Sequence, residues 1–304
     1  MVVARPQPPP ARPPSNERIY RRRRAVAATV ALALLALLIA ALGSSRGGGR
    51  HTSAKASAHS RLAVTRTVAE RQALTKAAEE RAIDHVLSYT PAIRAGGAKG
   101  NEVALTFDDG PGPYTVQLVS ELQKLGVHGT FFAIGNEERY FSPGTQLELR
   151  SGDVVGDHTE SHPMLASLSA HDQSEELFEQ LARIELLGGP RPRLFRPPYG
   201  SFNATTFKLL HKLRLLMVLW STDTDDYTIP GVPAIVQSAL AGAHPGAIIL
   251  MHDAGGDRTE TIAALPAIVS GLRRKGLQPV TVPRLLLDDP PPPGQPLPTS
   301  LAGD

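Results

Sequence analysis

The sequence predicts an α/β protein, a barrel-like (β/α) fold of about seven strands that is preceded by a single N-terminal transmembrane helix. Between residues 100 and 287, short apolar runs alternate with helix-like stretches, which is the pattern of parallel β/α units. Five of these runs end in ionisable residues. Before them, residues 25–43 form an uncharged apolar stretch of nineteen residues, about the length that crosses a bilayer core as a helix.

The N-terminal segment predicts the topology. Residues 1–24 are rich in proline and arginine and are expected to form a disordered cytoplasmic tail. Arg21–Arg24 stand directly before the apolar stretch, and the positive-inside bias keeps such an N-terminus in the cytoplasm. A cleaved signal peptide is the alternative, but the preceding extension is long and no Ala-x-Ala site follows at once. We therefore expect a single-pass protein of the cell membrane, anchored by residues 25–43, with its folded domain outside the cytoplasm; secretion after cleavage is the alternative.

The other boundaries follow from composition. Glycine and serine dominate the segment after the apolar stretch, and residues 61–89 lack proline and glycine before Pro91. The last residues are again rich in proline. The predicted parts are a flexible linker (44–60), a helical stalk (61–99), the folded domain (100–287) and a disordered tail (288–304).

Composition excludes several kinds of site. The 304-residue chain has no cysteine, so it has no disulfide framework, thiolate nucleophile or cysteine metal cage. Its net charge of +3 at pH 7 is mild, and much of the basic excess lies before the folded domain. We therefore expect no nucleic-acid partner.

Seven apolar runs are the predicted strands, and amphipathic stretches between them are the predicted helices. The runs are VALTF (103–107), GTFFAIG (129–135), DVVG (153–156), RLF (193–195), LLMVLW (215–220), AIILM (247–251) and QPVTV (278–282). The clearest helical stretches are residues 115–126, 173–188 and 261–276.

Ionisable side chains follow five of the runs. In a β/α barrel, residues at the carboxyl ends of the strands converge on one face, where active sites lie. Five such coincidences are more than turn chemistry explains. The residues are Asp108 with Asp109, His158 with His162, Arg196 with Tyr199, Asp223 with Asp226, and His252.

These residue types suit a metal-dependent hydrolase. His158 and His162 are four residues apart, and on a helical turn both rings would face the same way. The pair alone is more often explained by surface or core histidines, but an added aspartate leaves a tetrahedral cation one open position. One carboxylate of Asp108–Asp109 would then bind the cation, and the other would accept a proton from water that the cation activates.

The remaining groups complete that chemistry. His252 can protonate a leaving group, and a nearby aspartate would orient its imidazole and raise its pKa. Arg196 can pair with the free aspartate and keep it ionised. The backbone N–H of Tyr199, in a stiff proline-rich loop, can donate to an oxyanion. No Gly-x-Ser-x-Gly elbow, phosphate loop or HExxH motif is present.

Five motifs in order resemble the polysaccharide deacetylases, the carbohydrate esterase family with the chitooligosaccharide deacetylase homology domain. They are TFDDGP (106–111), HTESHP (158–163), RPPYG (196–200), DTDDY (223–227) and LMH (250–252). The segments GTFFAIGN (129–136) and FRPPYGSFN (195–203) also resemble sequence segments that are usual in the family. The resemblance covers residues 100–285 and implies a distorted (β/α) barrel of about seven strands. The implied roles are Asp108 as base, Asp109, His158 and His162 as metal ligands, Arg196 as the residue that positions the base, Tyr199 as backbone donor, Leu250 in the acetyl pocket and His252 as general acid.

The sequence departs from the family pattern at two positions. Tyr227 stands where the family more often has tryptophan, which alters one wall of the substrate groove, and Asp157 stands where asparagine is common. Asp226 is the first choice for tuning His252, with Asp223 left open. Tyr199 and Tyr227 are also candidates for stacking on a sugar, whereas Trp220 is expected in the core.

The resemblance implies removal of N-acetyl groups from N-acetylglucosamine-type sugars of a cell-wall polysaccharide. Peptidoglycan is the first expectation because an outward-facing tethered enzyme reaches the wall first, and chitin-type oligomers come second. An O-acetyl esterase acting on xylan or another acetylated polysaccharide is the alternative. A catalytically silent wall-binding module is a third hypothesis, against which the intact residue set argues. The expected cofactor is one divalent metal ion; zinc suits the ligands, and cobalt, nickel or manganese would tolerate them.

Overall fold

The structure is a computed structural model that describes residues 52–301, with side chains from residue 70 onward. By its contacts the chain divides into Met1–Arg66 and Thr67–Asp304, and all strands lie in the second unit. The predicted tail (1–24), membrane anchor (25–43) and first part of the linker lie outside the described residues. In the part that is described, no helix is long and apolar enough to cross a membrane.

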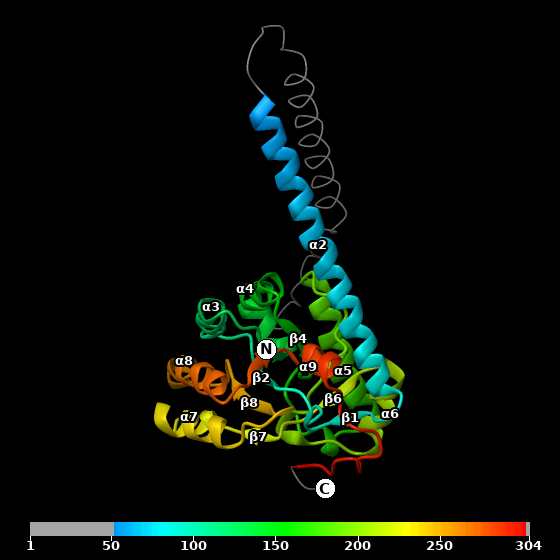
Figure 1. Ribbon diagram of the computed structural model, residues 1–304. Coiled ribbons are helices and arrows are strands. Elements are labelled where there is room, and N and C mark those ends of the chain that lie inside the picture. The colour runs from blue at the N-terminus through cyan, green and yellow to red at the C-terminus, as the bar shows by residue number, and fades with distance from the viewer. Residues whose placement is uncertain (1–51, 302–304) are drawn as a thin grey trace, which may run out of the picture. The chain divides into compact units, whose positions relative to one another are not determined.

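One parallel sheet forms the centre of the fold (Figure 1). Along it the strands follow the order β1-β6-β5-β4-β3-β2-β8-β7, and β9 also pairs with β2. An isolated antiparallel bridge between Ala95 and Ala247 joins the segment after β1 to the start of β8. The strands are β1 (Ala92–Ile93), β2 (Glu102–Asp108), β3 (Thr130–Ala133), β4 (Val154–Asp157), β5 (Leu194–Phe195), β6 (Leu216–Val218), β7 (Thr222–Asp223), β8 (Ile248–His252) and β9 (Gln278–Val280).

The α/β barrel-like class is confirmed, but the expected number of strands was too low. All seven predicted runs form strands, and two further strands, β1 and β7, bring the sheet to nine. Each of the two added strands is only two residues long. So short an extended segment has no hydrophobic periodicity of its own, and only pairing with β6 or β8 defines it.

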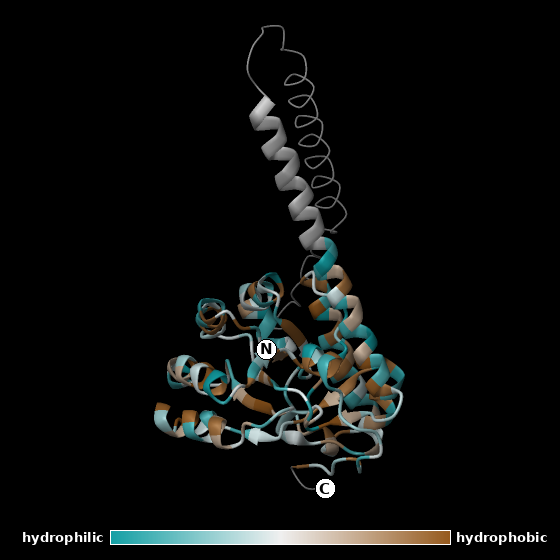
Figure 2. Cartoon of the chain, viewed as in Figure 1, coloured by the Kyte–Doolittle hydropathy of each residue, from teal (hydrophilic) through white to brown (hydrophobic). Residues whose placement is uncertain are grey.

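Helices cover the sheet and pack their apolar faces on it. The strands are mostly brown in Figure 2 and the covering helices alternate in colour, as amphipathic helices do. The helices that follow strands are α3 (Thr115–Leu125), α4 (Gly135–Ser151), α5 (Ala170–Leu186), α6 (Ala204–Leu213), α7 (Val232–Ala241), α8 (Thr259–Arg274) and α9 (Val282–Asp288). Three short 3-10 turns, η1 (Leu165–Ser167), η2 (Pro198–Gly200) and η3 (Asp226–Thr228), lie among them.

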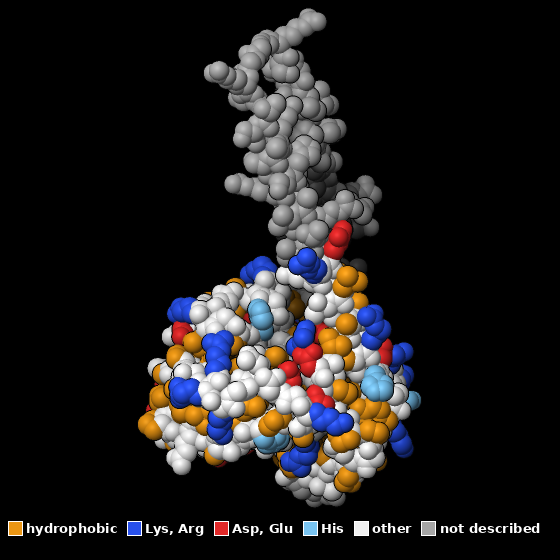
Figure 3. All heavy atoms as spheres, viewed as in Figure 1, with side chains coloured by type: hydrophobic (Ala, Val, Ile, Leu, Met, Phe, Trp, Pro, Cys, Tyr) orange, Lys and Arg blue, Asp and Glu red, His pale blue; other side chains and the backbone are white. Residues whose placement is uncertain are grey.

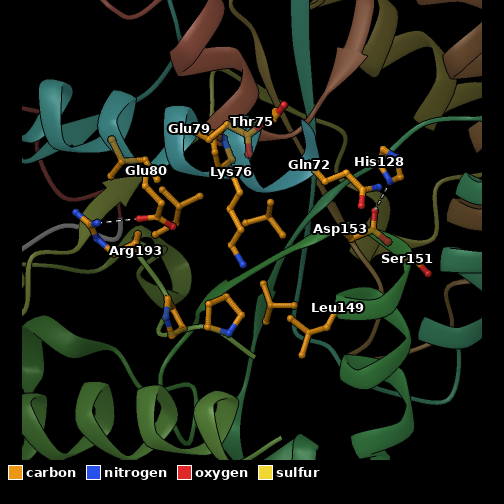
Figure 4. Close-up of a pocket in the computed structure, with 18 of the residues that line it drawn as sticks. Gln72, Thr75, Lys76, Glu79, Glu80, His128, Leu149, Ser151, Asp153 and Arg193 are labelled. Carbon is orange, nitrogen blue, oxygen red and sulfur yellow. Dashed lines mark hydrogen bonds and ion pairs between the residues drawn. The ribbon is translucent and has the colours of Figure 1, made fainter. Parts of the chain in front are cut away.

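The long helix α2 (Thr52–Leu87) begins inside the predicted flexible linker and includes most of the predicted stalk. Of the described side chains, Ile83 and Val86 are buried in the core. Arg193 donates to the Glu80 carboxylate at 2.8 Å (Figure 4). It also pairs with Asp84. A cavity of about 910 Å³ lies between α2 and the loops before β4 and β5. The last turns of α2 therefore pack as part of the barrel.

The surface charge of the described part is mixed. Lys and Arg side chains are spread among acidic and apolar ones on the face shown in Figure 3. The segment after α9 has no helix or strand up to residue 301. It nevertheless makes specific hydrogen bonds, through the carbonyl of Pro291 and the hydroxyl of Ser300.

Candidate active site

The predicted site residues lie at the carboxyl ends of neighbouring strands. Asp108 and His252 are the last residues of β2 and β8, where they are paired in register. His158 and Arg196 directly follow β4 and β5. A cavity of about 720 Å³ opens at this end, and its walls include all the predicted site residues except Arg196 and Asp226. Those two are almost completely buried and make hydrogen bonds to residues of the wall.

Asp109, His158 and His162 form the candidate metal centre. One ligand atom of each lies within 4.8 Å of those of the other two. The Asp109 Oδ1 atom is 3.2 Å from His162 Nε2 and 3.6 Å from His158 Nε2. Burial would raise the pKa of Asp109, but hydrogen bonds from His158 and His162 and the positive charge of His158 and His252 hold it well below its usual range. Two imidazoles and an ionised carboxylate are a donor set that fits a divalent cation of the zinc type.

The two histidines are not on a helical turn, which corrects the local geometry expected from their spacing. Residues 158–164 form an irregular loop after β4. Thr159 and His162 have positive φ angles of 72° and 61°, and the Thr159 hydroxyl accepts a hydrogen bond from the His162 backbone at 3.0 Å. The loop, and not helical periodicity, brings the centres of the two rings to 5.0 Å from each other.

Hydrogen bonds at the far side of each ring orient the two histidines. His158 Nδ1 lies 2.7 Å from the carbonyl oxygen of Arg196, which can only accept, so Nδ1 carries a proton and Nε2 is the ring nitrogen that faces Asp109. His162 Nδ1 lies 3.1 Å from the Tyr199 hydroxyl. Both Nε2 atoms are thus directed at the same point.

Arg196 holds Asp108 from below the cavity. Its Nη1 atom donates to Asp108 Oδ1 at 2.8 Å and to the Thr106 hydroxyl at 2.9 Å, and its Nε atom donates to the carbonyl of Val218 at 2.9 Å. The guanidinium is fully buried and lies 4.2 Å from the centre of the Phe132 ring. Burial lowers the pKa of Arg196, and the Asp108 charge opposes that shift. The second oxygen of Asp108 is 3.7 Å from His158 Nε2, so this carboxylate borders the candidate metal centre.

Asp226, at the start of η3, is the carboxylate in contact with His252. Its Oδ1 lies 2.7 Å from His252 Nδ1, and its Oδ2 accepts from the His252 backbone at 3.0 Å. Burial would lower the pKa of His252, but the hydrogen bond and negative charge of Asp226 raise it to about 9. Asp223 instead accepts a hydrogen bond from the backbone of Asp225.

Two residues at the beginning of α8 support this pair and were not predicted. The Thr261 hydroxyl donates to Asp226 Oδ2 at 2.7 Å. Arg258, which is 2% exposed, donates to the carbonyls of Ala254 at 2.7 Å and Asp226 at 3.3 Å. It therefore ties the loop that carries Asp226 to the loop after His252. Neither residue belongs to a motif, and only the folded contact assigns it a role.

The candidate substrate residues form the walls of the cavity. Leu250 is buried at its base, whereas Tyr199 and Tyr227 are more than half exposed at its rim. The Tyr227 ring makes an edge contact with His252 at 5.5 Å between ring centres. Trp220, expected in the core, is only partly buried; it lines the cavity and lies 5.7 Å from the Arg196 guanidinium.

Asp157, one of the two departures from the family pattern, is fully buried behind the histidines. One oxygen accepts the Thr159 backbone N–H at 2.7 Å, and the other has no hydrogen-bond partner among the described residues. Burial raises the pKa of Asp157 well above its usual range. Above about pH 3.8 the unfolded chain releases this proton while the folded protein keeps it, so Asp157 makes folding less favourable as the pH rises.

Replacing Asp157 by asparagine should therefore stabilise the protein more at pH 8 than at pH 5. Asparagine keeps an oxygen for the Thr159 N–H and cannot ionise. We expect the melting temperature to rise by a few degrees more at pH 8, as measured by differential scanning calorimetry. Glu179→Gln, at an exposed position of α5, is the matched control and should show no such difference. An equal gain at both pH values would contradict the assignment.

Comparison with known proteins agrees with this fold and with the family resemblance. The sequence model of the polysaccharide deacetylase family matches residues 95–218. A peptidoglycan-N-acetylglucosamine deacetylase of Bacillus cereus is 37% identical over 195 residues, which cover 60% of this chain and 87% of that protein. The chain belongs to the polysaccharide deacetylase family, as its five motifs led us to expect.

Solved structures show the same architecture. A crystal structure of a peptidoglycan N-acetylglucosamine deacetylase superimposes with a TM-score of 0.63 at 31% identity, covering 66% of this chain and 94% of that one. A pseudoenzyme of the same carbohydrate esterase family from Bacillus anthracis superimposes with a TM-score of 0.61 at 27% identity, covering 65% and 69%. A similar fold therefore occurs both in an enzyme and in a pseudoenzyme, so activity has to be argued from the site.

Proposed function

We propose that this protein removes N-acetyl groups from amino sugars of a cell-wall polysaccharide, with peptidoglycan as the first candidate. The observation that carries the proposal is the arrangement of one cavity. Three metal-type ligands lie at its centre, Asp108 with its buried Arg196 borders them, and His252 with its buried Asp226 ends the neighbouring strand. The similarity to named peptidoglycan deacetylases supports the choice of substrate.

The candidate metal centre would hold one divalent cation through Asp109, His158 and His162. Such a cation polarises a carbonyl oxygen and lowers the pKa of water towards neutrality. Zinc suits this set best, and cobalt, nickel or manganese fit the same donors.

The protein's own groups would then move the protons. Asp108 would accept a proton from the attacking water, because Arg196 holds one oxygen and leaves the other towards the candidate metal centre. The backbone N–H of Tyr199 would donate to the acetyl oxygen as it becomes negative. His252 is the acid that delivers a proton to the sugar nitrogen as the C–N bond breaks, since Asp226 keeps the imidazole charged. The products are acetate and the free amino sugar.

The proposed location follows from the sequence alone. Residues 25–43 and the arginines before them favour a membrane anchor with the catalytic domain outside the cytoplasm. A wall polysaccharide would be accessible from that position.

The test is acetate release by the purified protein. The protein is stripped of metal with a chelator, reloaded with Zn²⁺, Co²⁺, Ni²⁺ or Mn²⁺, and assayed on peptidoglycan, on N-acetylglucosamine oligomers and on an acetylated xylan. We expect release from an amino-sugar substrate only after reloading. His171→Ala, which removes an exposed histidine on α5, should leave this release unchanged.

Two results would overturn the proposal. Release from acetylated xylan alone would indicate an O-acetyl esterase. No release from any substrate by protein that binds metal would indicate a silent wall-binding module.

A further inference from the structure

The C-terminal strap, which we define as residues 289–301, runs along the barrel from α9 to the candidate active site. At its beginning, Asp289 accepts hydrogen bonds from the backbone of Lys99 at 2.6 Å and Gly100 at 2.8 Å. The Tyr89 hydroxyl then donates to the carbonyl of Pro291 at 2.7 Å. Figure 1 shows the strap in red, descending from α9 to the lower edge of the view.

The strap ends on the motif that carries Tyr199. The Leu301 N–H donates to the carbonyl of Gly200 at 3.0 Å, and the Ser300 hydroxyl lies 3.3 Å from the same oxygen. The Leu301 side chain packs on Gly200 so closely that a Cβ atom there would lie 2.8 Å from Leu301 Cβ. The prolines of the strap restrict its backbone before it docks, which reduces the entropy lost on docking.

The motif turn that the strap contacts has an unfavourable backbone. Tyr199 and Gly200 both have positive φ angles, 58° and 66°, and tyrosine rarely adopts this conformation. Inside the turn, the Gly200 N–H donates to the Pro197 carbonyl at 3.0 Å. On another side, the Ser201 hydroxyl accepts from the Ala166 backbone at 3.1 Å. The strap adds the contact at the carbonyl of Gly200, the residue directly after Tyr199.

We propose that the C-terminal strap is a positioning segment of the active site, which acts through Leu301 on the turn that carries Tyr199. The turn sets both the direction of the Tyr199 backbone N–H and the contact of its hydroxyl with His162. Without the strap, the turn relaxes and the donor is misplaced. The catalytic part of this inference rests on the proposed deacetylase activity, whereas the conformational part does not.

Single substitutions in the strap distinguish this positioning role from a strap that only covers the surface of the barrel. Leu301→Asp puts a charge against Gly200, and Leu301→Met keeps an apolar side chain there. Leu297→Asp places the same charge in the same segment at a residue of comparable exposure, 53% against 40% for Leu301. Leu301→Asp should lower kcat for acetate release about tenfold, with KM changed less than threefold and the metal content and melting temperature unchanged. Leu301→Met should retain at least half of the wild-type kcat, and Leu297→Asp should behave as wild type.

A second measurement does not depend on activity. Hydrogen–deuterium exchange of the peptide that contains residues 197–203 should become faster in Leu301→Asp and stay unchanged in Leu297→Asp. Unchanged exchange and unchanged kcat in Leu301→Asp would overturn the proposal, as would equal losses in both aspartate variants. If the wild type releases no acetate but the exchange result holds, the deacetylase assignment fails while the positioning contact stands.

Discussion

Asp108→Asn should lower kcat for acetate release by about three orders of magnitude, within the range by which a positioned general base accelerates a reaction. The asparagine side chain cannot accept the proton of the attacking water. Its oxygen can still receive the 2.8 Å hydrogen bond from Arg196, so the buried guanidinium keeps a neutral partner. The loss of the opposing charge should cost some stability, about 1–3 kcal/mol, because Arg196 is fully buried.

The measurement combines steady-state kinetics with metal analysis of the same samples. Asp108→Asn should bind as much metal as wild type, because Asp108 is not one of the three candidate ligands. Asp109→Asn is the matched control one residue away and should lose both metal and activity. If Asp108→Asn lost its metal, or kept more than a tenth of the wild-type kcat, the division of roles between the two aspartates would be wrong.

The convergence of the motif residues could be predicted because they lie at strand ends, whereas the division of roles between Asp108 and Asp109 came from the family resemblance. Strands β2, β4, β5 and β8 were all recognisable as apolar runs, and parallel strands bring the residues after them to one edge. Asp108 and His252 are direct neighbours in register, whereas the alternating pattern indicated only that they lie on the same face of the barrel. The part of the site that rests on chain order and strand ends was therefore within reach of the sequence.

Local patterns failed where an element has no periodicity of its own. Helix α4 was not singled out from the sequence, because Pro143 and Gly144 interrupt its pattern; the helix bends beside them at Phe141. The two histidines at helical spacing lie in a loop whose residues Thr159 and His162 adopt positive φ angles. Spacing alone does not distinguish a helical turn from such a loop.

The supporting contacts could not be predicted, because they join distant parts of the chain. Thr261 reaches Asp226 across 35 residues, and Leu301 reaches Gly200 from the other end of the domain. The sequence pattern left Asp223 and Asp226 as alternatives for the partner of His252. Only the 2.7 Å contact of Asp226, and the different partner of Asp223, separate the two in the fold.

That difference makes Asp226→Asn the second decisive substitution. The negative charge of Asp226 and its hydrogen bond raise the pKa of His252 to about 9 against the effect of burial. An asparagine supplies no charge, so burial is then opposed by the charges of Asp108 and Asp109 alone, and the pKa of His252 should fall well below about 9. The acid form would be scarce at pH 8, and we expect kcat there to fall about 100-fold.

The test of this assignment is the direction in which the pH–activity profile shifts. In wild type the activity should decline on the basic side only as the pH rises through about 9, where His252 loses its proton. In Asp226→Asn this decline should begin at a clearly lower pH than in wild type, and the acidic side of the profile should stay where it is. Asp223→Asn is the matched control, because Asp223 lines the same cavity and makes no hydrogen bond to His252 among the described contacts. A shift of the basic limb in Asp223→Asn but not in Asp226→Asn would reverse the assignment.

The free energy of unfolding should depend on the same ionisation of His252. The folded protein binds this proton more tightly than the unfolded chain, whose histidine has the ordinary pKa of 6.5. The stabilisation from charged His252 is therefore complete below about pH 6.5 and is lost as the pH rises through about 9. Asp226→Asn removes it, so the difference in melting temperature from wild type should be larger at pH 6 than at pH 9.5. Kinetics and calorimetry would then both report the ionisation of His252. If the two pH dependences disagreed, the decline of activity at high pH would belong to a group other than His252.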